Sequence, residues 1–250
     1  MLDTFIWYLI KVKNNLTSFE KVDSELPYRK YLFDELIDNY SKDYFKNKRF
    51  LEIGPRDGED TFRLETLSPS EIVIFDLPDK TENNLTWLNK IKTNYKFIED
   101  NFMYISKKEF ADLGKFDLIY FTGVLYHNPE QLRFLQKIYQ KLNNNGILVL
   151  ESATTRQRKF IKKNVVEILY PSTYRDTTTI THLPSKKAIL SWLKMVGFIK
   201  IFESKCYIHE NYNSKKHRFA CIAEKTEDGV QEVYYKKQIE DSPYIIGGST

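Results

Sequence analysis

Glycines and an acidic residue mark the first predicted strand of this 250-residue chain at a spacing that suits cofactor binding. The strand over 49–53 carries Glu52 and breaks into a turn between Gly54 and Gly58, with Pro55 inside it. Glycine adopts tight or left-handed turns at little cost, and its missing side chain lets a ligand lie against the backbone. The turn therefore predicts a site for an adenosine-bearing cofactor, although an ordinary strand–turn–helix has the same pattern.

Acidic and aromatic residues also follow the next predicted strands. Asp76, after the strand over 71–75, can accept hydrogen bonds from both hydroxyls of a ribose. Asp100 can accept one from an adenine amino group, and Phe102 can offer its ring to the base. Ligands of open α/β sheets bind beyond the carboxyl ends of the strands, although the two acids also suit a helix cap and a turn. The predicted cofactor-binding residues are Glu52, Gly54, Pro55, Gly58, Asp76, Leu77, Asp100, Asn101, Phe102 and Gly123.

Two of the four histidines are candidates for catalysis. His127 lies just past the apolar strand over 116–121, beside Tyr126, for which we predict a substrate contact. A hydroxyl nucleophile must lose its proton as it attacks, and a nearby imidazole can take that proton. A histidine at this position can instead cap the following helix. His182, in the loop after a basic segment, is the second candidate.

The middle of the chain alternates between predicted strands and helices. Continuous apolar strands such as 116–121, between amphipathic helices such as 129–142, are typical of a parallel sheet covered on both faces. A short polar connection joins the last two predicted strands, 198–206 and 218–223, as in an antiparallel pair. The predicted organisation is a helical N-terminal extension or lid (1–47), an α/β domain (48–225) with an insertion (151–183), and a polar tail (226–250).

The insertion at 151–183 is predicted to bind the acceptor substrate. It interleaves cationic and aromatic side chains, which together can hold an anionic group. A solvated cationic helix is the alternative interpretation. The predicted substrate-binding residues, besides Tyr126, are Arg156, Arg158, Tyr170, Tyr174 and Arg175.

Charge and composition narrow the class of protein. A net charge of +4 and a pI near 8.7 are too weakly basic to require a nucleic-acid partner. The two cysteines indicate a reducing, cytoplasmic location and cannot build a metal cluster, so no metal is expected. The apolar start, 1–10, is too short to span a bilayer and lacks a cleavage site, which predicts no membrane role. The oligomeric state stays open.

The segment from about 48 to 223 resembles the class I S-adenosylmethionine-dependent methyltransferases. The turn Glu52–Gly58 resembles their first motif, Asp76 their ribose-binding acid and Asp100 their adenine-side acid. Phe116–His127 resembles their fourth motif, and Ile147–Glu151 their fifth strand. The resemblance implies an α/β, Rossmann-like fold: a seven-stranded, mostly parallel sheet with a reversed last strand and helices on both faces.

Three stretches resemble a narrower group, the bacterial tRNA wobble-uridine carboxymethyltransferase-like proteins: Gly123–His127, Leu183–Phe198 and Arg218–Lys225. That group has a longer N-terminal domain that helps to grip a carboxylated cofactor and RNA, whereas only residues 1–48 precede the first strand here. Asp57 stands where many members have a glycine. The chain has no Gly-x-Gly-x-x-Gly triplet to seat a pyrophosphate, so a cationic sulfonium cofactor fits better.

The resemblance implies S-adenosyl-L-methionine as the cofactor, with carboxy-S-adenosyl-L-methionine as the alternative. We expect a methyltransferase acting on a small, polar, anionic acceptor, as in O-methylation of a sugar or nucleotide-linked sugar in glycan or capsule biosynthesis. The partner would then be a small molecule or glycan. One alternative is a tRNA wobble-base (carboxy)methyltransferase, which makes nucleic acid the partner. The other is a non-catalytic binding module with the methyltransferase fold.

Overall fold

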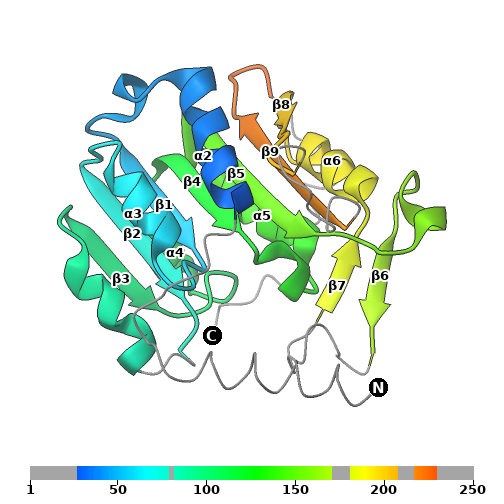
Figure 1. The fold of residues 1–250 in the computed structure, drawn as a ribbon, viewed down its shortest axis with the longest axis horizontal. Helices are drawn as coiled ribbons and strands as arrows, with labels where there is room; N and C mark the ends of the chain where they lie inside the picture. The colour runs from blue at the N-terminus through cyan, green and yellow to red at the C-terminus, as the bar shows by residue number, and fades with distance from the viewer. Residues whose placement is uncertain (1–26, 79–81, 171–180, 208–216, 230–250) are drawn as a thin grey trace, which may run out of the picture.

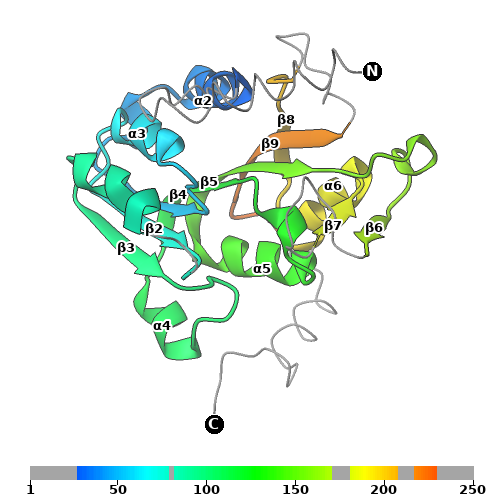
Figure 2. The same ribbon diagram turned by 60° about the horizontal axis from the view of Figure 1, so that its bottom comes forward.

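The structure, a computed structural model, describes residues 27–78, 82–170, 181–207 and 217–229. A central sheet lies between two layers of helices (Figures 1 and 2). The apolar start 1–10 and most of the predicted tail lie outside the described residues, so the predicted domain boundaries remain predictions. In the described ranges, no helix has both the length and the apolar character that crossing a membrane requires.

Seven strands form the central sheet, in the order β3-β2-β1-β4-β5-β9-β8. They are β1 (Arg49–Ile53), β2 (Glu71–Asp76), β3 (Tyr95–Glu99), β4 (Phe116–Thr122), β5 (Leu142–Ala153), β8 (Lys200–Glu203) and β9 (Arg218–Glu224). The first five pair in parallel, whereas β9 runs antiparallel to both β5 and β8. The predicted mostly parallel sheet with a reversed last strand is therefore confirmed.

Helices cover both faces of this sheet, as predicted (Figure 2). One face carries α2 (Pro27–Tyr40) and α3 (Glu59–Glu65), and the other carries α4 (Lys107–Asp112), α5 (Gln131–Lys141) and α6 (Lys186–Met195). Short three-ten helices complete the layers: η1 (Asp43–Phe45), η2 (Glu82–Lys90), η3 (Leu125–His127) and η4 (Arg158–Phe160).

Two apolar cores lie on opposite faces of the sheet. Successive side chains of a strand point to opposite faces, and in β1 Phe50 joins the core under α2 and α3 while Leu51 joins the core under α5 and α6. Leu32 of α2 and Ile138 of α5 are each fully buried, one in each core. Burial on both faces explains why these strands are apolar throughout.

Two predicted elements differ from the structure. The helix predicted over 86–93 is the three-ten helix η2, which begins and ends earlier; Thr86 and Asn89 are poor α-helix formers. The insertion 151–183 contains a two-stranded antiparallel hairpin of β6 (Val166–Leu169) and β7 (Thr181–Pro184). The sequence did not predict these strands, because each has only four residues.

The parallel strands bring their carboxyl ends to one edge of the sheet. The backbone N of Gly54, after β1, donates to the carbonyl of Phe75 in β2 at 2.8 Å. The backbone N of Gly123, after β4, donates to the carbonyl of Glu151 in β5 at 3.0 Å. The turns that follow β1 and β4 are therefore fixed against neighbouring strands, at the edge where side chains can converge.

Candidate active site

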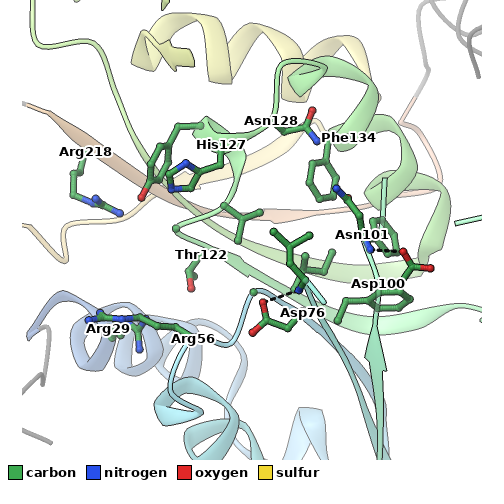
Figure 3. A pocket seen from close by; sticks show the side chains of 18 of the residues that line it. Arg29, Arg56, Asp76, Asp100, Asn101, Thr122, His127, Asn128, Phe134 and Arg218 are labelled. Atoms are coloured by element: carbon green, nitrogen blue, oxygen red, sulfur yellow. Dashed lines mark hydrogen bonds between the residues drawn. The ribbon is translucent and has the colours of Figure 1, made fainter. Parts of the chain in front are cut away.

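A cavity of about 470 Å³ opens at this edge of the sheet, between the strand ends and α2 (Figure 3). Its wall contains nine of the residues predicted from the sequence: Gly54, Asp76, Leu77, Asp100, Asn101, Phe102, Gly123, Tyr126 and His127. Sequence reasoning missed ten others: Tyr28, Arg29, Ile53, Arg56, Phe75, Thr122, Val124, Asn128, Phe134 and Arg218.

The glycine turn lies against the cavity at Gly54 and against the protein at Gly58. Both have a left-handed backbone, with φ of +73° and +79°. A Cβ at Gly54 would meet Val124 Cγ2 at 2.4 Å, and one at Gly58 would meet the Trp87 ring. Gly58 and Pro55 are not among the wall residues, so they contribute to the conformation of the turn and do not line the cavity.

Two carboxylates follow neighbouring strands on one side of the cavity. Asp76 ends β2 and is 8% exposed, and its Oδ1 accepts a hydrogen bond from the backbone N of Leu77 at 2.9 Å. Asp100, just after β3, accepts one from the backbone N of Asn101 at 2.6 Å. Phe102 lies beneath them, buried against Phe75. These bonds fix the carboxylates at the edge where the strands end (Figure 3).

Glu52 is not among the wall residues of the cavity, so its predicted contact with the cofactor stays a prediction. Its side chain is buried, and its Oε2 accepts a hydrogen bond from Thr61 Oγ1 at 2.5 Å. Burial, reinforced by the Asp60 carboxylate, raises the pKa of Glu52 to about 8. Glu52 lies two residues after Phe50 in β1, so its side chain points to the same face of the sheet. Its hydrogen bond with Thr61 therefore connects β1 to α3.

Arg29, from α2, holds the glycine turn in place. Its guanidinium lies 3.1 Å from an Asp57 oxygen, 3.4 Å from Glu59 and 3.5 Å from Asp60. The Asp57 carboxylate, which would repel a pyrophosphate, is therefore paired within the protein. The three acidic residues within 57–60 are the one sequence feature that suggests a cationic partner for the turn. The sequence does not show that this partner is Arg29, on a helix before β1.

Arg218, the first residue of β9, forms the opposite end of the cavity. Its Nε and Nη2 donate to the buried carboxylate of Glu151 at 2.5 and 2.7 Å, and Tyr207 also donates to Glu151. Although burial disfavours the charge, the Glu151 carboxylate raises the pKa of Arg218 above its ordinary range. The guanidinium lies 5.6 Å from the ring of Tyr28 and 5.7 Å from that of Tyr126. It is a fixed cation at the cavity wall.

His127 is half-buried in the cavity wall, at the end of η3 (Figure 3). Its ring centroid is 4.0 Å from that of Tyr126. The side-chain acceptor before α5 comes from Asn128, whose Oδ1 accepts from the backbone N of Glu130 at 2.7 Å. Asn128 thus supplies a side-chain acceptor in this turn, and both roles considered for His127, proton acceptor and helix cap, remain predictions.

His182 is not among the wall residues. It lies in β7, where its carbonyl accepts a hydrogen bond from Gln131 Nε2 at 2.6 Å. The predicted acceptor residues of the insertion are also outside the wall, since Arg156, Arg158 and Tyr170 are exposed beside or in the hairpin. The remaining two, Tyr174 and Arg175, lie outside the described residues. Among the described residues, no group of His, Cys, Asp or Glu is arranged to hold a metal ion.

Comparison with known proteins identifies the family. A methyltransferase-domain family model matches residues 26–201, so the chain belongs to this family of methyltransferases. Among its curated relatives, the tRNA U34 carboxymethyltransferase of Nautilia profundicola is 27% identical over 202 residues, covering 74% of this chain and 64% of that protein. The enzyme of the same name from Campylobacter fetus is 26% identical over 174 residues, covering 68% and 57%. The chain thus spans roughly half to two thirds of the length of these relatives.

Solved structures share the fold at low sequence identity. The N-terminal domain of EvdMO1, crystallised with S-adenosylhomocysteine and D-fucose, has a TM-score of 0.59 at 18% identity, covering 78% of this chain and 83% of that one. The Burkholderia thailandensis 1,6-didemethyltoxoflavin N1-methyltransferase, with S-adenosylhomocysteine bound, has a TM-score of 0.59 at 12% identity, covering 89% and 90%. These likenesses confirm the Rossmann-like methyltransferase fold.

Proposed function

We propose that this methyltransferase transfers a methyl group from S-adenosylmethionine to a small, polar, anionic acceptor. The observation that carries the proposal is the division of the cavity into two chemically different halves. The carboxylates of Asp76 and Asp100 face one half, while His127 and Arg218 face the other (Figure 3). The ring of Tyr126 lies beside both His127 and Arg218. The first half suits a nucleoside with hydroxyl and amino donors, and the second suits an anion that carries a nucleophile.

The residues present fit the proposed cofactor. Gly54 lines the cavity without a side chain, which allows a ligand to approach its backbone closely. Asp76 would accept from ribose hydroxyls, and Asp100 would take the adenine side. When bound, S-adenosylmethionine supplies a methyl group on a positively charged sulfur. The protein's role is to bind the cofactor, orient the acceptor and exclude water.

We propose that His127 is the general base that removes the proton from the acceptor. A sugar hydroxyl is a weak nucleophile until its proton is removed, and an imidazole beside it can take that proton as attack proceeds. Tyr126, which is buried and has its ring centroid 4.0 Å from that of His127, forms a wall beside this position and helps to exclude water. Arg56, whose side chain is 55% exposed at the wall, supplies an accessible cation for the acceptor's anionic group. O-methylation of a sugar or nucleotide-linked sugar, carried out in the cytoplasm, is our specific proposal.

Calorimetric titration with S-adenosylhomocysteine tests the proposal. Asp76→Ala should weaken binding about tenfold or more, because hydrogen bonds to a charged acceptor contribute about 1.5–3 kcal/mol. Asp38→Ala, an exposed carboxylate on α2, is the matched control and should bind as the wild type does. Equal affinity of the Asp76 variant and the wild type would exclude the proposed cofactor site. Mass spectrometry of copurifying ligands would then identify the cofactor and acceptor.

A second candidate is carboxymethyl transfer to a tRNA wobble uridine, with carboxy-S-adenosylmethionine as the cofactor. It is favoured by the names of the curated relatives and by Arg218, whose cation could meet a cofactor carboxylate. Under this alternative, the copurified cofactor carries an additional carboxylate, and bulk tRNA binding weakens steeply with salt. Retention of plain S-adenosylmethionine without tRNA binding would favour the first candidate.

A further inference from the structure

The hairpin β6–β7 has two faces of opposite character. Residues 165, 167 and 169 are partly buried on the inner face, where Leu169 packs against a cluster of Tyr126, Ala153 and Leu183. On the outer face, Val166, Ile168 and Tyr170 are 39%, 64% and 93% exposed. The alternation is that of a strand with one face packed on the protein and one apolar face that the described residues leave exposed.

The chain's excess positive charge is concentrated beside that face. Residues 154–170 contain five cationic side chains and one carboxylate, which equals the net charge of +4 of the whole chain. Outside this segment, the charges of the chain therefore balance. The cations precede β6 and are all exposed: Arg156, Arg158, Lys159, Lys162 and Lys163. The one acid, Glu167, is turned inward and accepts from Thr155 Oγ1 at 2.6 Å.

We propose that this surface, the exposed face of β6 with the preceding cationic loop, docks on the surface of a lipid bilayer that contains anionic lipid. Interfacial binding combines burial of apolar side chains at the headgroup boundary with attraction of Lys and Arg to anionic headgroups. Ile168 and Val166 are aliphatic and can enter that boundary, while Tyr170 can lie at headgroup level. The hairpin forms a sheet of its own and lies at one edge of the described part of the molecule (Figures 1 and 2).

The composition of the outer face favours lipid over nucleic acid. Single-stranded nucleic acids are held by aromatic rings that stack on bases, together with a basic groove. Tyr170, which directly follows β6, is the sole aromatic among the three described side chains of the outer face, and aliphatic side chains have no planar face to offer. Phe160 of the loop is partly buried, with Lys159 Nζ 4.8 Å from its ring centroid. The inference concerns a surface outside the cavity and holds whatever the acceptor is.

Vesicle cosedimentation with the full chain tests the docking. Phosphatidylcholine vesicles containing phosphatidylglycerol should bind the protein, and phosphatidylcholine alone should bind it far more weakly. Lys162→Glu with Lys163→Glu should weaken binding to anionic vesicles at least about thirtyfold, since each Lys near such a surface contributes about fivefold. Ile168→Ser should weaken binding severalfold at constant charge.

Matched controls separate docking from general charge and polarity. Lys107→Glu with Lys108→Glu reverses two exposed charges on α4, and Ile199→Ser removes an exposed aliphatic side chain that is 57% exposed. Both should bind like the wild type, with melting temperatures of all variants unchanged. Absence of vesicle binding, or equal weakening by the controls, overturns the proposal. Binding of bulk tRNA but not vesicles, lost in the Lys162/Lys163 variant, would assign the surface to nucleic acid.

Discussion

The imidazole of His127 and that of His182 differ in their access to the cavity, and that difference gives a test of catalysis. His127→Asn should lower kcat by about 10²–10⁴-fold, the usual contribution of a general base, while affinity for S-adenosylhomocysteine stays unchanged. The rate is measured as methyl transfer from labelled S-adenosylmethionine into a metabolite extract. The readout separates a lost base from a damaged cofactor site.

His182→Asn is the control, because only the backbone carbonyl of that residue forms its bond to Gln131. It should retain the wild-type rate. A His182 variant as slow as the His127 variant would contradict the assignment of the base to the wall histidine alone.

Glu52 predicts a dependence of stability on pH. Its pKa rises from 4.5 to about 8 on folding, so the folded protein holds a proton that the unfolded chain releases between these values. The free energy of unfolding should therefore fall as pH rises from about 4.5 to 8, by a few kcal/mol for this group. Glu52→Gln keeps an acceptor for Thr61 without the ionisation and should flatten the slope. Chemical denaturation across this range measures it, and parallel slopes in the two proteins would contradict the assignment.

Among the elements, the turn between β1 and α3 depends on its glycines for two separable reasons. Gly58→Ala places a Cβ in a left-handed backbone and against the Trp87 ring at 2.2 Å. We expect a loss of roughly 2–4 kcal/mol in the free energy of unfolding, from strain and overpacking together.

Gly123→Ala is the matched comparison, because its φ is +75° but nothing lies within 4 Å of the added Cβ. It should lose only about 1–2 kcal/mol, the backbone contribution. Thermal or denaturant unfolding compares the two variants. Equal losses would show that the contact with Trp87 is easily relieved.

Sequence patterns predicted the elements that follow one periodicity and missed those made by distant partners. The apolar strands that end near Gly54, Asp76 and Gly123 predicted both the parallel sheet and the edge of the sheet at which the cavity lies. Arg29 and Arg218 could not be assigned to that edge, because their carboxylate partners are far away in the chain. The short strand β6 was also not predicted, because its exposed side chains are apolar and alternate with partly buried ones.

The molecule as a whole is joined around the pair of Arg218 and Glu151. Tyr28 comes from α2, Glu151 from β5 and Tyr207 from the segment after β8, so the pair links both ends of the described chain. Arg218→Met leaves a fully buried carboxylate without its cation and should cost about 3–5 kcal/mol of the free energy of unfolding.

The double variant Arg218→Met with Glu151→Gln should recover much of this loss, because no unpaired charge remains buried. Urea unfolding of the two single variants and the double variant completes the cycle. Additive losses would mean that the two side chains do not act as a pair.

The hairpin of β6 and β7 contacts the turn after β4, so the proposed docking surface and the cavity share one contact region. Gln131 bonds the His182 carbonyl, and Leu183 packs on Tyr126, whose neighbour His127 lines the cavity. If binding at the docking surface displaced the hairpin, these contacts are the ones through which the turn would be affected. Such coupling would be reciprocal. If docking on a membrane changed the affinity for the cavity's ligand by some factor, the bound ligand would change the affinity for the membrane by the same factor. Occupancy of the cavity would then regulate where the enzyme is held.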